Sequence, residues 1–148
     1  MSDITSKSSR DIFISHAHED KEIVAIPLYE NLTKKGLNVW IDREEFQIGK
    51  NIKEMIDQGL KYCNFGIVII SKFYMQKHWT LYEYQNLYIR QIQEKRAIII
   101  PIWHNVTYSD VEFSTLHFLK DVYALNSNIG PKALSKEIFK IFSRSRFT

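Results

Sequence analysis

Two short apolar runs constrain the fold of this chain more than any other feature. Residues 65–70 (FGIVII) and 97–103 (AIIIPIW) contain almost no polar side chains. Runs of this length are typical of strands buried on both faces, as in a parallel sheet that helices cover on both sides. The second run is the longest in the chain and is far shorter than the ~20 apolar residues that a membrane-spanning helix needs. We therefore predict a water-soluble domain with no membrane partner.

Candidate strands and helices alternate along the rest of the chain. The other strands are expected at residues 11–15, 37–42 and 122–125, and the helices before residue 35 and at residues 51–61, 79–94 and 131–142. Pro27 predicts a kink or a helix start, and Gly36 is placed to end that helix. Alternation without hairpin signals predicts an α/β fold. We expect a flavodoxin-like three-layer sandwich, with a five-stranded parallel sheet in the order 2-1-3-4-5. Ligands of such sheets bind beyond the strands' carboxyl ends, near the switch point between the first and third strands.

Length, charge and cysteine content bound the rest. The 148 residues suit one domain, which we place at residues 11–142, between a disordered leader (1–10) and a flexible tail (143–148). The bare length, with no sensor module, favours a piece of a longer protein. The single cysteine, Cys63, cannot form an internal disulfide, and the N-terminus lacks the apolar core of a secretory signal, so we expect a cytoplasmic protein. A net charge of +3 is too mild to favour direct nucleic-acid binding.

Several motif classes are missing or weak. The five glycines form neither a dinucleotide-binding G-x-G-x-x-G motif nor a phosphate-binding loop, and no G-x-S-x-G motif marks a hydrolase nucleophile. The pair His16 and His18 invites a metal hypothesis, but the spacing is weak and no Cys or His partner is fixed nearby, so we predict no metal. A phosphoacceptor domain would need Asp at the end of the third strand, where Ser71 stands.

Three separate segments carry a family resemblance. Residues 11–21 (DIFISHAHEDK), residues 39–42 (VWID) followed by 46–49 (FQIG), and residues 69–74 (IISKFY) running on to 79–83 (WTLYE) resemble the signature segments of TIR domains. The last segment matches the W-x-x-x-E arrangement of the family, and residues 100–103 (IPIW) are similar to the fourth strand of its bacterial members. The match is in the right order and spans about residues 11–142.

The resemblance implies an activity. Many TIR domains cleave NAD⁺ at the nicotinamide–ribose bond, and the enzymatic members carry a glutamate at the position of Glu83. NAD⁺ would then be the substrate, no cofactor would be needed, and the product would be ADP-ribose or a cyclic variant. The family also implies activation by self-association with other TIR domains, as a homo-oligomer or filament, in immune and, for a bacterial source, antiphage signalling. The alternative is a non-catalytic adaptor that acts by homotypic assembly.

The expected site combines a helix with several loops. Trp79 and Glu83 are four residues apart on a predicted helix and so share a face, nearly opposite the apolar stripe of Leu81, Tyr84, Tyr88 and Ile92. Spacing alone fits a solvated first-turn glutamate as well, and the resemblance is what makes Glu83 the catalytic candidate. Substrate-binding candidates are Ser15, His16, Ala17, His18, Asp42, Gln47, Ser71 and Trp79. For Asp42 and Gln47 a capping role and simple solvent exposure remain open.

Overall fold

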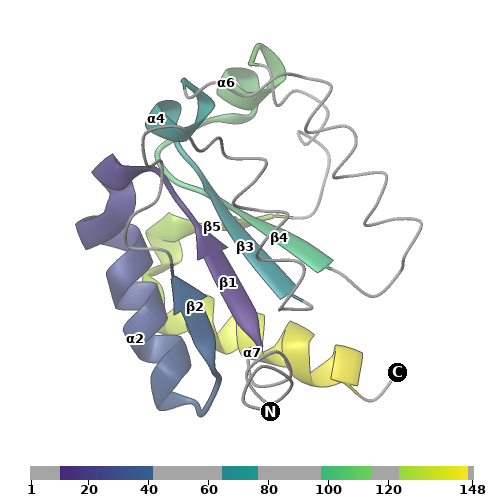
Figure 1. The fold of residues 1–148 in the computed structure, drawn as a ribbon. Coiled ribbons are helices and arrows are strands. Elements are labelled where there is room, and N and C mark those ends of the chain that lie inside the picture. The colour runs from purple at the N-terminus through teal and green to yellow at the C-terminus, as the bar shows by residue number, and fades with distance from the viewer. Residues whose placement is uncertain (1–10, 42–64, 77–97, 115–123, 147–148) are drawn as a thin grey trace, which may run out of the picture.

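Five parallel strands form the sheet in the computed structural model, which describes residues 11–41, 65–76, 98–114 and 124–146. The strands are β1 (Ile12–Ser15), β2 (Val39–Ile41), β3 (Phe65–Ile70), β4 (Ile98–Trp103) and β5 (Leu125–Asn126). They are hydrogen-bonded in the order β2-β1-β3-β4-β5 (Figure 1). This is the predicted order 2-1-3-4-5, and the flavodoxin-like fold class is confirmed.

The apolar run at residues 65–70 is the central strand. β3 spans the whole run, lies between β1 and β4, and has all six of its residues buried. β4 begins one residue after the predicted start at residue 97. Both strands are apolar on successive residues, because each face of a covered parallel sheet is a buried face.

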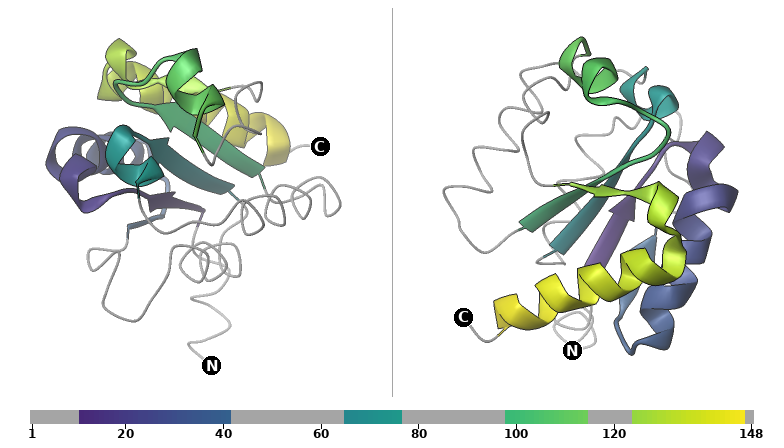
Figure 2. Two further views of the ribbon diagram at one scale, coloured as in Figure 1. Left: turned by 90° about the horizontal axis from the view of Figure 1, so that it is seen from above. Right: turned by 180° about the vertical axis from the view of Figure 1, so that it is seen from behind.

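Successive residues of β1 alternate between two buried faces of the sheet. Ile12 and Ile14 of β1 belong to one core with Leu28 of α2 (Ile26–Lys34) and Ile138 of α7 (Pro131–Arg146). These two helices pack together and cover one face of the sheet (Figure 2). Phe13 points to the opposite face and is also buried, at 3% exposure. Burial on both faces is what the three-layer sandwich requires.

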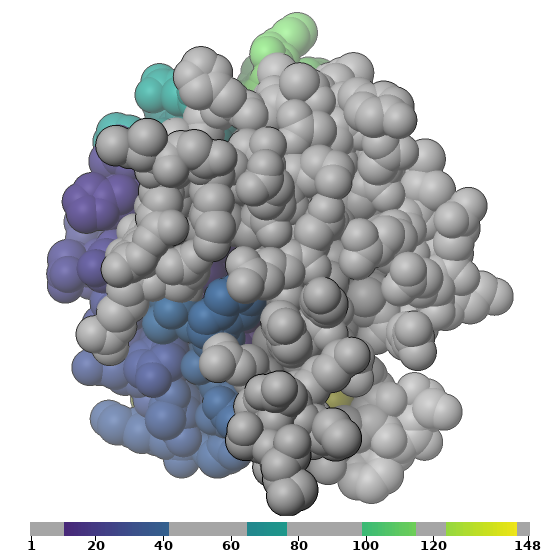
Figure 3. Space-filling model, in the orientation of Figure 1, coloured from purple at the N-terminus to yellow at the C-terminus, as the bar shows by residue number. Residues whose placement is uncertain are grey.

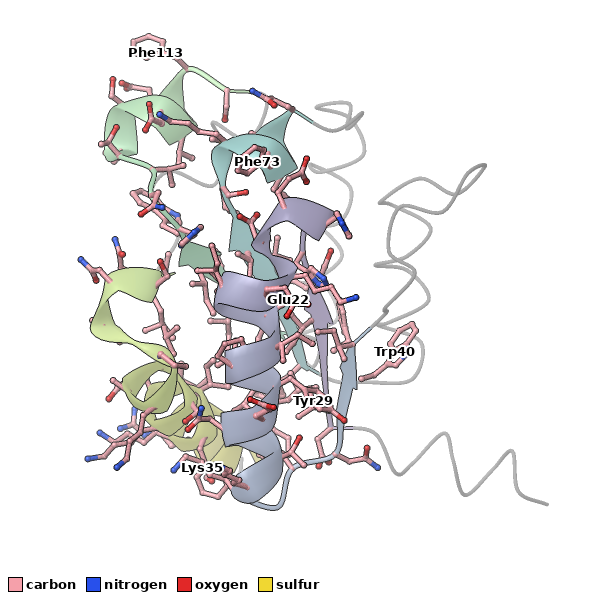
Figure 4. The ribbon with its side chains drawn as sticks, turned by 90° about the vertical axis from the view of Figure 1, so that its left-hand side faces the viewer. Glu22, Tyr29, Lys35, Trp40, Phe73 and Phe113 are labelled. Atoms are coloured by element: carbon pink, nitrogen blue, oxygen red, sulfur yellow. The ribbon has the colours of Figure 1, made fainter. Side chains whose placement is uncertain are left out.

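The chain turns helical directly after β1. A 3-10 turn, η1 (His18–Asp20), leads into a π-helical turn, η2 (Lys21–Ala25), and then into α2. Pro27 occupies the first turn of α2, which confirms the predicted helix start. Gly36 follows the helix with φ +89°, in the left-handed region that glycine tolerates. Glu22, Tyr29 and Lys35 mark the course of this segment (Figure 4).

Two element boundaries differ from the prediction. β2 starts at Val39 instead of residue 37, because the Leu37 N–H donates to Leu32 O and belongs to the turn that ends α2. The helix α7 continues to Arg146, four residues past the predicted end at 142, so most of the expected tail is helical. Residues 143–146 contain no glycine or proline that would end a helix.

Short helices cap the carboxyl ends of the strands. α4 (Lys72–Met75) follows β3, α6 (Tyr108–Glu112) follows β4, and η4 (Ser127–Ile129) follows β5. In the space-filling view α4 and α6 emerge at one end of the molecule, while η2 and α2 line one side (Figure 3). Within the described ranges, no helix has both the length and the apolar character to cross a membrane.

Candidate functional site

The carboxyl ends of β1 and β3 meet at the switch point of the sheet. Ser15 is the last residue of β1, and Ser71 directly follows β3. The two strands are parallel neighbours, and the chain leaves β1 towards β2 on one side and β3 towards β4 on the other. Ligands of open α/β sheets bind at this kind of place. The structure therefore brings the loop after β1 and Ser71 together, as predicted.

The loop after β1 exposes few of its side chains. Ser15, His16 and Ala17 are all buried, with 5%, 0% and 0% of their surface exposed. The side chain of His18 is exposed, in contrast. Among these four candidates only His18 is exposed to solvent, and Ser15, His16 and Ala17 are buried as whole residues, main chain included.

The burial of His16 also bears on the metal question. A metal needs both imidazoles at one point, whereas His16 is inside the protein and His18 is outside. In the described part of the chain, no cluster of three or more His, Cys, Asp or Glu side chains could hold a metal ion.

Polar side chains behind the loop are joined by hydrogen bonds. The Ser71 hydroxyl donates to Asp20 Oδ2 at 2.5 Å and accepts from the Tyr74 N–H at 3.1 Å. The Tyr74 and Ser15 hydroxyl oxygens lie 2.9 Å apart, close enough for a hydrogen bond. Asp20 and Tyr74 are themselves 2% and 0% exposed. These contacts lie under the loop and fix where it runs.

Ser71 has a local role as well as a long-range one. It is the N-cap of α4, with an extended backbone (φ −127°, ψ 174°) and a side-chain oxygen that accepts from the third residue of the helix. Serine is a preferred residue at this position, because its oxygen satisfies an N–H that the helix leaves unpaired. Where a phosphoacceptor aspartate would stand, the chain thus has a helix cap bound to the buried carboxyl group of Asp20.

Four of the predicted site residues lie outside the described residues: Asp42, Gln47, Trp79 and the catalytic candidate Glu83. Their roles stay predictions. Asp42 directly follows β2 in the chain, and Trp79 follows Met75, the last residue of α4, after three intervening residues.

Sequence reasoning assigned no site role to Asp20 and Tyr74. In the sequence, Asp20 and Tyr74 stand out only as members of the TIR-like segments 11–21 and 69–74. Their partners are 51 and 59 residues away in the chain, so no local pattern announces the contacts. The local signal was Ser71 itself, because a serine directly after an apolar strand is a preferred helix N-cap.

A second polar group lies at the ends of β4 and β5. His104 follows β4, its N–H donates to Ile70 O at 2.9 Å, and its Nδ1 lies 2.7 Å from the Ser127 hydroxyl. These bonds fasten the end of β4 to β3 on one side and to η4 on the other. His104 therefore has a structural role at this end of the sheet.

Comparison with known proteins gives a consistent family assignment. The model of the TIR domain family matches residues 12–128. The chain is 37% identical over 137 residues to the NAD(+) hydrolase TcpC of Escherichia coli, a match that covers 92% of this chain and 44% of that protein. It is 42% identical over 120 residues to the 2' cyclic ADP-D-ribose synthase BtTIR of Bacteroides thetaiotaomicron, with coverage of 80% and 41%. The chain thus spans less than half the length of these curated relatives.

The fold comparison agrees. The TIR domains of the activated Roq1 resistosome, which recognises the pathogen effector XopQ, superpose with a TM-score of 0.68 at 20% sequence identity. The superposition covers 89% of this chain and 98% of that one. At this identity the likeness supports the fold alone.

Proposed function

Because this chain belongs to the TIR domain family, we propose that it cleaves NAD⁺ at the bond between nicotinamide and ribose. The observation that carries the proposal is the identity of 37% and 42% to relatives that are named as an NAD(+) hydrolase and a 2' cyclic ADP-D-ribose synthase. Both matches cover 80% or more of this chain. NAD⁺ is a substrate in this proposal, and no cofactor is required.

One carboxylate suffices for this chemistry. The bond between ribose C1′ and the pyridinium nitrogen breaks with its electron pair going to nitrogen, so nicotinamide leaves as a neutral molecule and needs no general acid. Ordinary glycoside hydrolysis differs, because a carboxylic acid must protonate its leaving group. The ribosyl cation is stabilised by a nearby anion, and we assign that role to Glu83. Water then adds to C1′ and releases a proton, which gives ADP-ribose, or a nucleophile of the same molecule adds and gives a cyclic product.

The loop after β1 forms the other part of the proposed site. The exposed His18 of this loop stands at the switch point of the sheet, where an imidazole N–H can donate to a phosphate oxygen of NAD⁺. Trp79, Asp42 and Gln47 are proposed to complete the site around the ribose and nicotinamide.

We further propose that self-association with other TIR domains activates the enzyme, in immune signalling that for a bacterial source would be antiphage defence. Activity per molecule should then rise with protein concentration. A rate per molecule that stays constant over a hundredfold range of concentration would contradict the self-association step and leave the cleavage reaction standing.

The test is product analysis with matched glutamate variants. Purified protein is incubated with NAD⁺ at several protein concentrations, and nicotinamide, ADP-ribose and cyclic products are separated by chromatography. Glu83→Gln and Glu83→Ala should each lower the rate by about 10²–10³-fold, as loss of one stabilising group in an active site does. Glu30→Gln is the control, since Glu30 is exposed on α2.

Two results would overturn the proposal. Equal nicotinamide release by wild type and both Glu83 variants would exclude Glu83 as the catalyst. No release from the wild type at any concentration would reject the activity and favour the non-catalytic adaptor.

A further inference from the structure

Both ends of the loop after β1 are tied to one short helix. At its start, the Ser15 hydroxyl lies 2.9 Å from the Tyr74 hydroxyl. At its end, Asp20 accepts a hydrogen bond from the Ser71 hydroxyl. Ser71 and Tyr74 are the N-cap and the third residue of α4. We call these four residues, Ser15, Asp20, Ser71 and Tyr74, the α4 clamp.

The hydrogen bonds of the clamp close a ring together with the main chain between Ser15 and Ala17. From Ser15 the path runs through the Tyr74 side chain to the Tyr74 N–H, which donates to Ser71 Oγ. Ser71 then donates to Asp20, whose own N–H donates to Ala17 O at 3.0 Å inside the loop. The loop is therefore bonded to α4 at both of its ends, and the Asp20 N–H to Ala17 O bond closes a turn within it. A path of this kind leaves the main chain of residues 16–19 few alternative courses.

Burial makes the ring specific. All four residues of the clamp are at most 5% exposed. Inside a protein a polar group left without its partner is costly, because no water replaces the lost bond, and a fully bonded network therefore favours one geometry over others. The clamp thus defines the conformation of the loop, and its buried side chains offer almost no surface to a ligand.

The same contacts argue against a direct role for two residues. The hydroxyls of Ser15 and Ser71 face Tyr74 and Asp20 inside the protein, with 5% and 2% of each residue exposed. His18, in contrast, is exposed between the two ends of the clamp. The part of the loop that a substrate can reach is the part that the clamp holds in place.

We propose that Ser71 and Tyr74 are positioning residues, which set the course of the loop so that the exposed His18 meets NAD⁺ correctly. This inference rests on the proposed function for its substrate. Neither residue touches the substrate in this scheme, and each acts through the loop. Loss of the clamp should therefore lower kcat, through misplacement of the bound substrate, more than it raises KM.

The test removes single atoms of the clamp. Tyr74→Phe deletes one hydroxyl and keeps the buried ring, and Ser71→Ala deletes the hydroxyl that joins Asp20 to α4. Ser71→Thr is the rescue variant, because threonine keeps the hydroxyl and suits the extended backbone at this N-cap. Ser135→Ala is the matched control, since Ser135 is also fully buried but donates to Lys132 O within α7.

Two readouts are needed. The first is amide hydrogen exchange of residues 16–20 in the absence of NAD⁺, normalised to the core amides of β3. The second is the steady-state rate of nicotinamide release, divided into kcat and KM. We expect exchange at least about tenfold faster in the loop for Tyr74→Phe and Ser71→Ala, since exchange reports local opening. We also expect a loss of kcat of at least about fivefold for both variants, with both effects reversed in Ser71→Thr and absent in Ser135→Ala.

The outcomes separate the two proposals. Loop exchange that stays at the wild-type rate in both deletion variants would overturn the clamp, even if NAD⁺ turnover is present. Faster exchange spread evenly over the whole protein would also overturn it, because that result indicates general destabilisation. Faster loop exchange with unchanged kcat would overturn the positioning role. A wild type that releases no nicotinamide overturns the proposed function and with it the substrate role, while loop exchange still decides whether the clamp orders the loop.

Discussion

Gly66 lies where three strands leave no room for a side chain. Its register partners are Phe13 in β1 and Ile99 in β4. A Cβ atom at residue 66 would lie 2.4 Å from Phe13 Cζ, 2.5 Å from Phe13 Cε1 and 3.0 Å from Ile99 Cδ1. Carbon atoms in van der Waals contact are ~3.5–4.0 Å apart, so Phe13 would have to move by about 1 Å or more. Gly66→Ala is therefore expected to destabilise the fold.

The size of the effect follows from how freely Phe13 can yield. Its ring is 3% exposed, and its centroid lies 6.5 Å from that of Trp40 (Figure 4 shows Trp40 on the side of the sheet away from α2). Overpacking of a filled interior costs about 1–3 kcal/mol. Replacing glycine by alanine returns about 0.4–1 kcal/mol, because the unfolded chain loses freedom. The net loss should be about 1–2 kcal/mol, or about 2–8 °C in Tm for a domain of this size.

The assay is urea unfolding of a double-mutant cycle with Phe13→Leu. Leucine lacks the far ring atoms that the new Cβ would meet, so the two changes should be less harmful together than their separate effects predict. We expect a coupling energy of at least about 0.5 kcal/mol. Additive effects would refute the steric explanation, and an unchanged or raised stability of Gly66→Ala alone would refute the close approach of the Phe13 ring to Gly66.

Two further predictions concern the ends of helices. The Thr107 N–H donates to the Asp110 carboxylate at 2.8 Å and so lowers the pKa of that carboxyl group below its ordinary value of 3.8. The ionised carboxylate therefore stabilises the folded state above pH 3.8, and this stabilisation is lost as the pH falls through the lowered pKa. The Tm advantage of wild type over Asp110→Asn should accordingly shrink below about pH 4, and an advantage that is constant from pH 6 to pH 2 would contradict the assignment. Gly36 has φ +89° with nothing within 4 Å of an added Cβ, so Gly36→Ala should cost about 1–2 kcal/mol from backbone strain alone. Gly36→Asn should cost less, and thermal unfolding that ranks alanine above asparagine would rule this out.

The parts of the fold that could be predicted are those with a local signal. β3 coincides with its apolar run, because continuous burial on two faces leaves no position for a polar side chain. Pro27 and Gly36 were predicted correctly for the same reason, since each acts through its own backbone geometry. The short helices α4 and α6 were missed, because four or five residues are too few to show a helical period. The capping box of Thr107 and Asp110 was readable in the sequence as a helix start.

In the candidate site, too, the features with a local sequence signal could be predicted and those that depend on distant residues could not. The switch point could be located from the strand order alone. The structure shows Ser15, His16, Ala17, His18 and Ser71 at the ends of β1 and β3 beside it, while their part in binding a substrate stays a prediction. What could not be predicted is which way their side chains face. Ser15 and His18 are three residues apart in one motif, yet the first is buried and the second exposed. The Ser15 hydroxyl faces Tyr74, a residue 59 positions away that no local pattern links to it.

The α4 clamp also changes how the family resemblance should be interpreted. Its members come from the segments 11–21 and 69–74, which carry much of that resemblance. Four polar residues of these segments bond to one another inside the protein and do not face solvent. A motif of this kind specifies the conformation of a loop, and a substrate would be recognised by the residues that this conformation leaves exposed, such as His18. Substitution of Ser15 or Ser71 should therefore act mainly by disordering the loop, whereas substitution of His18 should act mainly on contact with a ligand.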